Sequence, residues 1–573
     1  MALGLMLGLT ASCSDFFDTE STHVIYADQN HLDVASDTIY SLIGILNRLQ
    51  AIGDRTVLLG EARGDLMDVT DYTSSDLRDV ALFNVGDDNQ YNVPRDYYAV
   101  INNCNYYIAK ADTALKNNRN QYLFRSEYAA AKAIRAWTYL QLVTTYGKVP
   151  FVTEPILSKE AAERDYPQYG IQEVCDYFLH QDGLQAMVDI EYPNYGSIKS
   201  IPSRLFYMPM YLVLGDLNLW AGNYLESAKC YYNYINTRNG SNSTYPTGIN
   251  SVNWEGSSWT RQVVSGIYSD FTEQSNSTNS ELIFMIPGDS VRSEGYYSEL
   301  RTLFNTSDDN DHQASLVPSQ SIIDLSAAQT YCYYNGDEYL YAPNTLEDYK
   351  AGDLRLSILW ENKEGSIDEN GNRYTSQYLY KHSTRNIRLY RRQLVYLRMA
   401  EALNRAGYPR FAYQILSSGV NTRIMNDSIL PAYRADSALL VQFDFPSTRY
   451  ILYDSENATT GSNTQGVHSR GCGWSRHNEY YQMPKDTTIT DSLALIAWQQ
   501  EKVEDMIVDE EALEFAFEGY RYYDLLRVAL RRNDPNYLAD KIYNRRGGEA
   551  TGISVDLTDK KNWFLHWNGQ IGY

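Results

Sequence analysis

Two pairs of predicted helices, each with a glycine between its members, do most to limit what this chain can fold into. Residues 205–236 read as a helix, a turn at Gly222 and a second helix, and residues 390–416 repeat the arrangement with Gly407 at the turn. Apolar residues recur in both segments at the spacing of about 3.6 that a packed helix requires. Because glycine lets a chain reverse sharply at the end of a helix, the sequence predicts antiparallel helical hairpins.

Small residues beside these turns favour close packing of the paired helices. Ala228 follows Gly222, and Ala400 and Ala412 lie on either side of Gly407. The hairpins resemble tetratricopeptide units, in which pairs of helices stack along the chain.

Two further helices are predicted nearer the N-terminus, at residues 96–115 and 126–146. Ser126, followed by Glu127, is expected to cap the start of the second helix, and Gly147 is expected to end it.

Long loop-rich stretches separate the helical segments. Residues 237–280, 288–381 and 426–490 are rich in Asn, Ser, Thr, Gly or Tyr and lack sustained helical periodicity. Asn370-Gly371 is typical of a hairpin turn between short strands. Loops of this length are usually functional. We therefore predict a mostly α fold with a few short strands and an irregular, loop-rich ligand-binding half.

Residues 511–527 read EALEFAFEGYRYYDLLR and carry paired charges. Their spacing predicts ion pairs of Glu518 with Arg521 and of Asp524 with Arg527. A helix through this segment would bury one stripe, made of Leu513, Ala516, Phe517, Tyr520 and Leu525. The glutamates Glu511, Glu514 and Glu518 could in principle serve as acid and base groups, but no histidine, nucleophile or metal-ligand spacing accompanies them, which argues against catalysis here.

The first thirteen residues, MALGLMLGLTASC, have an apolar run followed by small residues and Cys13. The run is far shorter than the roughly 20 residues of a membrane-spanning helix. It has the length of a signal-peptide core, although no Lys or Arg occurs before Arg48. The pattern resembles a bacterial lipobox, which implies lipidation of Cys13; a chance apolar N-terminus is the alternative.

Composition excludes some classes of partner. With 49 basic and 72 acidic residues, the chain has a formal charge of −23, which disfavours nucleic-acid backbones and anionic membrane surfaces. Tyrosine is abundant, with 51 Tyr against 16 Phe, and its polar tip suits half-buried walls and recognition surfaces. Five widely spaced cysteines besides Cys13 contain no CxxC pair, so we expect buried free thiols rather than disulfides or a metal cluster.

The C-terminal motif and two others together resemble the SusD/RagB family of nutrient-binding outer-membrane lipoproteins of Bacteroidetes. The segments that carry the resemblance are 513–515 (LEF), 517–521 (FEGYR), 524–527 (DLLR), 135–140 (RAWTYL), 146–151 (YGKVPF) and 397–402 (LRMAEA). They occur in the expected order over essentially the whole chain, and the lipobox agrees with them.

The resemblance implies a SusD-like protein that is lipid-anchored in the outer membrane and faces the cell exterior. Such a protein captures a glycan, or in some members peptides, and passes it to a SusC-like TonB-dependent transporter. The resemblance also implies that residues 1–13 are the signal peptide and lipobox and that residues 14–573 form one domain. Within this domain the helical scaffold is expected at about 30–236, 390–425 and 491–535, and the insertions at about 237–389 and 426–490. No ligand contacts transfer by motif; only Cys13 transfers as a site.

Aromatic residues in polar loops are the first candidates for ligand contact, because sugars bind through their faces to aromatic rings. Trp254 and Trp259 lie in SVNWEGSSWTR, and Trp474 lies in RGCGWSRHNEYY, where flanking glycines would allow an exposed ring. Tyr296 and Tyr297 follow Gly295 in the loop-rich middle of the chain. Loop packing or contact with a transporter is the alternative for each.

A second candidate is acidic. In RGDLMDVTDY, Asp65, Asp68 and Asp71 recur every three residues and are followed by Tyr72; carboxylates there could accept bonds from sugar hydroxyls or pair with a basic peptide. A solvated acidic surface is the alternative. No cofactor is predicted, and calcium is a weak possibility that rests on the hard oxygen ligands of Asp308, Asp309 and Asp311.

Searches for nucleophile, zinc and phosphate-binding motifs find nothing in the sequence, so we predict a binding protein and not an enzyme. The main hypothesis is glycan binding and delivery. Oligopeptide binding on the same architecture is the first alternative, and a structural lid is another. A surface glycoside hydrolase is the distant one, because it needs only two carboxylates.

Overall fold

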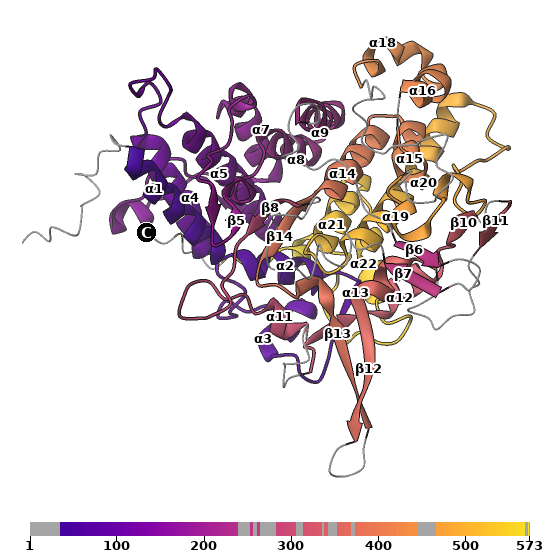
Figure 1. Cartoon of the computed structure of the whole chain (residues 1–573). Coiled ribbons are helices and arrows are strands. Elements are labelled where there is room, and N and C mark those ends of the chain that lie inside the picture. Colours follow the sequence, from indigo (N-terminus) through magenta and orange to yellow (C-terminus); the bar gives the residue numbers. More distant parts are fainter. Residues whose placement is uncertain are drawn as a thin grey trace, which may run out of the picture.

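Antiparallel helices packed side by side form the framework of the molecule (Figure 1). The computed structural model describes residues 35–238, 252–255, 260–263, 282–304, 313–334, 337–341, 352–367, 373–420, 422–443, 466–567 and 571. The described residues are mostly helical, and the sheets found among them are all two-stranded and antiparallel. This confirms the predicted fold class.

Both predicted hairpins are present. Helices α8 (Met210–Ala221) and α9 (Tyr224–Arg238) are joined at Gly222, whose φ is +82°. Helices α14 (Arg392–Arg405) and α15 (Pro409–Ser417) are joined at Gly407, whose φ is +98°. Side chains rarely adopt such angles, so glycine allows both reversals.

The helices follow one another in a row across the molecule. α1 packs on α4, α4 on α5, α5 on α7 and α8, and α8 on α9; α14 then packs on α9, α15 and α20 (Figure 1). The contact of α9 with α14 joins segments that lie on either side of the long central insertion. The row consists of α1 (Ala35–Gln50), α4 (Pro94–Lys110), α5 (Arg125–Tyr146), α7 (Ile171–His180), α8, α9, α14, α15 and α20 (Ser492–Phe515).

The ends of α4 and α5 differ partly from the prediction. α4 ends at Lys110, five residues before the predicted end. α5 begins at Arg125, its N-cap residue is Phe124, and no side chain caps it, so the prediction of Ser126 as the cap is wrong. Gly147 ends α5 with a φ of +76°, as predicted.

The remaining helices lie around this row, and most of them are short. The α-helices are α2 (Gly53–Glu61), α3 (Ser75–Ala81), α6 (Lys159–Ala162), α11 (Leu300–Leu303), α12 (Gln320–Ala327), α13 (Leu354–Leu359), α16 (Thr422–Ile424), α17 (Leu430–Ala432), α18 (Ser437–Leu440), α19 (Ser469–Cys472), α21 (Arg521–Arg532) and α22 (Pro535–Tyr543).

The strands pair in twos, and two of these pairs join distant parts of the chain. The pairs are β1 (Met67–Val69) with β9 (Leu316–Pro318), β2 (Lys148–Pro150) with β3 (Gln168–Gly170), β4 (Ser197–Ile198) with β5 (Ile201–Pro202), β6 (Val252–Glu255) with β7 (Thr260–Val263), β8 (Leu282–Ile286) with β14 (Ile387–Arg391), β10 (Cys332–Tyr334) with β11 (Tyr339–Tyr341), and β12 (Trp360–Ile367) with β13 (Arg373–Leu379). β12 and β13 are the strands predicted around Asn370-Gly371, whose turn lies outside the described residues.

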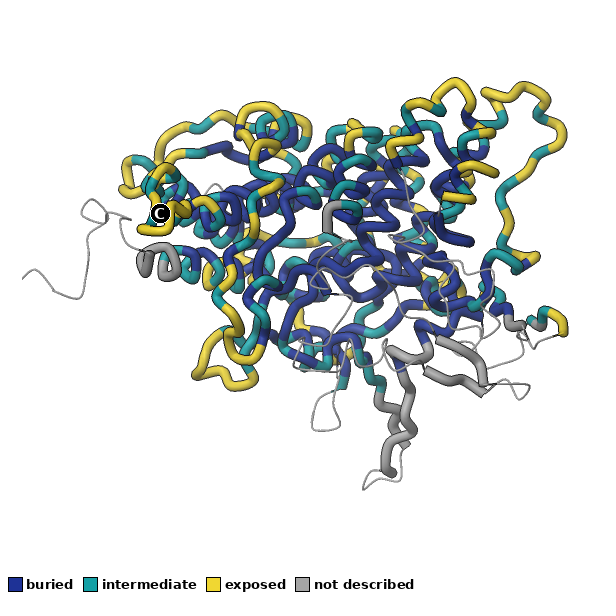
Figure 2. Tube along the Cα trace, turned by 45° about the horizontal axis from the view of Figure 1, so that its top comes forward, coloured by how far each residue is buried: buried dark blue, intermediate teal, exposed yellow. Residues whose placement is uncertain are grey.

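Buried residues follow the interior of the helical row, and exposed residues follow its margins (Figure 2). Tyrosine supplies much of this core because its hydroxyl can bond to a nearby carbonyl. The Tyr139 hydroxyl donates to the Val152 carbonyl at 2.7 Å, and that of Tyr98 donates to the Pro150 carbonyl at 2.6 Å. The five cysteines that the structure describes are buried free thiols, as predicted.

The C-terminal motif is not one helix. α20 ends at Phe515 and α21 begins at Arg521, so the predicted stripe through Leu513, Ala516, Phe517, Tyr520 and Leu525 is wrong. Phe517 has a φ of +75°, and the backbone N–H groups of Phe517 and Gly519 donate to the buried carboxylate of Glu61 at 3.0 and 2.7 Å. α2 thus supplies hydrogen-bond partners for the broken segment.

Among the helices that the structure describes, none combines the length and the apolar character that crossing a bilayer requires.

Candidate ligand-binding site

The strands β10 and β11 lie at the end of the molecule opposite α1 (Figure 1). Aromatic side chains of this hairpin contact aromatic side chains of the chain that follows α19. We call this group the aromatic surface; its members are Tyr339, Tyr341, Trp474, His477 and Tyr480.

Backbone contacts bring the two segments of the aromatic surface together. The Trp474 N–H donates to the Cys332 carbonyl at 2.9 Å, and the Tyr341 hydroxyl donates to the His477 carbonyl at 3.3 Å. Asn478 is buried and donates from its amide to the Thr330 carbonyl at 2.5 Å. These bonds hold the chain after α19 against the hairpin.

The rings of the aromatic surface are partly stacked and partly edge-on. Tyr339 stacks on His477 with centroids 4.6 Å apart, and it meets Trp474 edge-on at 6.3 Å. Tyr480 contacts Tyr341 edge-on at 5.3 Å and is 67% exposed. Tyr480 is the exposed ring of this set, and Tyr339, Tyr341 and His477 are partly exposed; exposed aromatic rings can cover the face of a sugar.

Trp474 supports this surface from beneath. We predicted an exposed Trp474 ring from its flanking glycines, but the residue is only 8% exposed, so that expectation is wrong. Gly473 has a φ of +72°, and a Cβ there would lie 2.2 Å from the Cys332 carbonyl oxygen, so this glycine serves the close approach of the hairpin instead of exposing the ring.

Polar groups accompany the rings. The Arg476 Nε–H donates to the His477 Nε2 at 2.7 Å. Burial and the adjacent Arg476 lower the pKa of His477 to about 4, so its imidazole is neutral at neutral pH. Glu479 is exposed beside Tyr480 and offers a carboxylate to hydroxyl groups.

The strand that carries Trp254 lies near this surface. β6 contacts both α13 and α19, and α19 directly precedes Trp474. The Trp254 side chain and the whole of Trp259 lie outside the described residues, so their predicted ligand contacts stay predictions.

The acidic candidates do not form one site. Asp65 is buried and accepts two hydrogen bonds from Arg521 at 2.5 and 2.8 Å, so its carboxylate is not available to a ligand. Asp68 is bound by Arg546 in the same way. Asp71 and Tyr72 are exposed, with Tyr72 at 64%, and remain open to solvent.

Tyr296 and Tyr297 anchor their loop. The Tyr296 hydroxyl donates to the Asp54 carboxylate at 2.8 Å. The Arg385 guanidinium lies 3.5 Å from the centre of the Tyr297 ring, and Arg292 approaches the same ring at 4.4 Å. Neither ring belongs to the aromatic surface.

The calcium candidates Asp308, Asp309 and Asp311 lie outside the described residues. Within the residues that the structure does describe, no three His, Cys, Asp or Glu side chains are grouped so as to hold a metal ion.

Residues 450–566 match the model of the SusD family. No curated protein matches the sequence. Solved structures match nearly the whole chain: a SusD superfamily protein from Bacteroides thetaiotaomicron has a TM-score of 0.55 at 15% identity, covering 92% of this chain and 95% of its own.

Two further solved structures have the same fold. The surface glycan-binding protein A from Bacteroides uniformis has a TM-score of 0.54 at 16% identity and covers 93% of this chain and 96% of its own. NanU from B. fragilis has a TM-score of 0.52 at 17% identity, and the match covers 94% of this chain and 95% of NanU. The chain therefore has a SusD-like fold, and its C-terminal part, residues 450–566, matches the SusD family.

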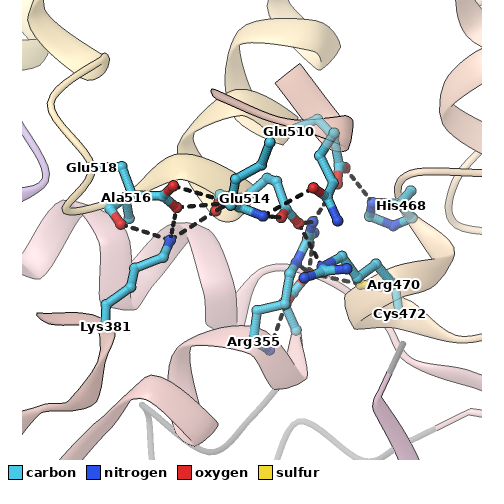
Figure 3. A network of polar contacts seen from close by, with 12 residues as sticks. Arg355, Lys381, His468, Arg470, Cys472, Glu510, Glu514, Ala516 and Glu518 are labelled. Carbon is cyan, nitrogen blue, oxygen red and sulfur yellow. Dashed lines mark hydrogen bonds and ion pairs between the residues drawn. The ribbon is translucent and has the colours of Figure 1, made fainter. Parts of the chain in front are cut away.

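The SusD-like C-terminal motif is the centre of a buried charge network (Figure 3). Glu514 contacts Arg355, Arg391 and Arg470 at 2.9 to 3.1 Å. Glu510 bonds to Arg355 and to His468, both at 2.7 Å. Because His468 and Arg470 belong to the chain around α19, the network fixes the segment that carries Trp474.

The ion pairs of this motif were predicted only in part. Asp524 pairs with Arg527 at 2.9 Å, as predicted. Glu518 contacts Arg391 and Lys381 instead of Arg521, which pairs with Asp65. An arginine has several N–H donors and can pair with carboxylates from distant segments. The fold therefore decides its partner more than sequence spacing does.

Four residues of the aromatic surface were missed in the sequence: Tyr339, Tyr341, His477 and Tyr480. For Tyr339 and Tyr341, the sequence does carry a signal. In YCYYNGDEYLY, tyrosines stand on both sides of Asn335-Gly336, which is typical of a hairpin turn. That turn would have placed Tyr339 and Tyr341 on one face of a strand.

Proposed function

We propose that this SusD-like protein binds a glycan on its aromatic surface and delivers it to a SusC-like TonB-dependent transporter. The observation that carries the proposal is a cluster of tyrosine rings beside polar groups, held by a buried network. A fold shared with a surface glycan-binding protein supports it.

In the proposed binding mode, aromatic rings and polar groups contact different parts of the sugar. The exposed Tyr480 ring and the partly exposed Tyr339 ring would cover sugar faces, whereas Arg476 and Glu479 would bond to hydroxyls. Trp474 and His477 would keep the rings in place. The proposal needs no catalytic group and no cofactor.

Binding measured by calorimetry against a panel of purified polysaccharides tests the aromatic surface. We expect Tyr339→Ala and Tyr480→Ala each to weaken the affinity for the best ligand roughly tenfold, because an exposed aromatic ring at a binding centre contributes more than about 1 kcal/mol. Tyr122→Ala is the matched control, since Tyr122 is also exposed and contacts basic side chains elsewhere.

The same panel decides among the alternatives. Oligopeptide binding is favoured only by the exposed pair Asp71 and Tyr72. Loss of peptide binding in Tyr72→Ala, with unchanged glycan affinity in Tyr339→Ala and Tyr480→Ala, would replace the proposal by this alternative. New reducing ends after incubation with a polysaccharide would identify a glycoside hydrolase.

We further propose that residues 1–13 are the signal peptide and lipobox, that residues 14–573 form one domain, and that a lipid on Cys13 holds the protein on the outer membrane, facing the exterior. We expect Cys13→Ala to move the protein from the membrane fraction to the soluble fraction. Continued retention in the membrane fraction would contradict lipid anchoring.

A further inference from the structure

A pocket distant from the aromatic surface has cationic and aromatic walls. It has a volume of about 580 Å³ and lies where the C-terminal chain, residues 561–567, crosses the end of α5. Trp567 of this segment contacts Tyr98 of α4, and α4 lies at the opposite side of the molecule from β10 and β11 (Figure 1). We call it the C-terminal pocket.

The C-terminal pocket is lined by three cationic side chains, Arg63, Lys148 and Lys561, and by His566. None of the described lining residues is Asp or Glu, although the chain as a whole has a formal charge of −23. Two of these side chains have an acidic partner outside the lining. Asp87 bonds to His566 at 2.7 Å, and Asp559 bonds to Lys561 at 2.5 Å.

Arg63 is the unusual member of this set, because it is only 1% exposed. Its guanidinium donates to the carbonyls of Leu59 and Trp563 and to the Tyr523 hydroxyl at 2.8, 3.3 and 3.2 Å. The Tyr522 ring lies 4.0 Å away. All these partners are neutral, and none of the described carboxylates lies within 4 Å, the ion-pair distance, of the Arg63 guanidinium.

The other arginines that are buried as fully have acidic partners. Arg391 and Arg470 contact Glu514, and Arg545 lies 3.7 Å from Asp68. A buried cation without a counter-ion is costly, and buried charges are normally paired. The field of Arg63 therefore favours an anion in the pocket that it lines.

The pocket walls also include aromatic rings. Phe564 packs against Gly147, where a Cβ would lie 2.8 Å from the ring, and Trp567 meets Tyr98 and Tyr146 edge-on at 5.6 and 5.7 Å. Phe83, which also lines the pocket, has a φ of +62°. A bulky residue rarely adopts this strained angle, and such strain often occurs at functional sites.

We propose that the C-terminal pocket binds the carboxylate of an acidic sugar. The cationic groups fit the carboxylate, and the aromatic rings fit the face of a sugar ring. The volume lies in the ordinary range of ligand pockets, about 300–1,000 Å³, and is larger than a bare inorganic anion needs. The inference that the carboxylate belongs to a sugar rests on the proposed function, whereas the inference that the ligand is an anion does not.

Calorimetry with the full chain and three probes, D-glucuronate, D-glucose and acetate, tests the assignment. We expect glucuronate to bind more tightly than either glucose or acetate. Lys148→Gln and Lys561→Gln should each weaken glucuronate binding about two- to fivefold, because exposed ion pairs contribute up to about 1 kcal/mol. Lys148→Glu should weaken it further, and added salt should act in the same direction.

Lys485→Gln is the matched control, because Lys485 is exposed and lies outside the pocket. Glucuronate binding that is absent, or that neither lysine variant changes, would overturn the proposal. Acetate binding as tight as glucuronate binding would overturn the assignment to a sugar. Binding of neutral glycans should stay unchanged in Lys148→Glu, which separates this test from that of the aromatic surface.

Discussion

Glu61 shows how one residue can link two elements and make the link depend on pH. Its carboxylate is fully buried and accepts from the N–H groups of Phe517 and Gly519. Burial raises its pKa to about 7, against the lowering effects of these N–H groups and of nearby Lys381, while Glu518 raises it further. In the unfolded chain its pKa is expected near 4.5.

The native state therefore binds more protons than the unfolded state between about pH 4.5 and 7, and the free energy of unfolding falls as the pH rises through this window. Glu61→Gln should remove this contribution, which amounts to about 3 kcal/mol at most. Urea denaturation of both proteins at pH 5 and pH 8 measures it. An identical change with pH in both proteins would show that Glu61 is not responsible.

At the scale of elements, the break between α20 and α21 depends on close approach of two backbones. A Cβ at Gly519, whose φ is +98°, would lie 2.5 Å from the Thr56 carbonyl oxygen. α2 therefore packs on this break only because glycine occupies the position.

Gly519→Ala should lower the free energy of unfolding by roughly 2–4 kcal/mol. The strain of a positive φ and the overlap of the added methyl group with the Thr56 carbonyl oxygen both contribute. Gly183→Ala is the matched control: its φ is +74°, but no atom lies within 4 Å of the added Cβ, so only about 1 kcal/mol is expected. Urea denaturation compares the two variants. Equal losses would show that close approach contributes nothing beyond backbone strain.

Elements formed by local signals were predicted well. The hairpins at Gly222 and Gly407 follow from periodicity and a turn glycine within one short segment. The start of α5 was misplaced because Phe124, which has no capping side chain, takes the place expected for Ser126. The pairing of β8 with β14 joins residues about one hundred positions apart, and no local pattern encodes that register.

The candidate site shows the same difference between local sequence signals, which were predicted, and long-range contacts, which were not. The loop of Trp474 was identified, but burial of its ring depends on the β10–β11 hairpin. The availability of Asp65 likewise depends on Arg521, which is 456 residues away along the chain. Contacts between distant segments decided which candidate side chains stay open to a ligand.

At the scale of the whole molecule, the helical row separates the two proposed binding regions, the aromatic surface and the C-terminal pocket. The buried network around Glu514 stabilises the chain beneath the aromatic surface (Figure 3). A glycan bound there would therefore rest on a rigid support. The central claim is that these rings carry the glycan affinity.

The most direct test is to measure the affinity of the double variant Tyr339→Ala, Tyr480→Ala for the glycan that the unaltered protein binds best in the panel. The account predicts a loss of binding that exceeds either single loss, with the affinity of Tyr122→Ala unchanged. Full glycan affinity in a folded double variant would contradict the aromatic surface as the glycan site.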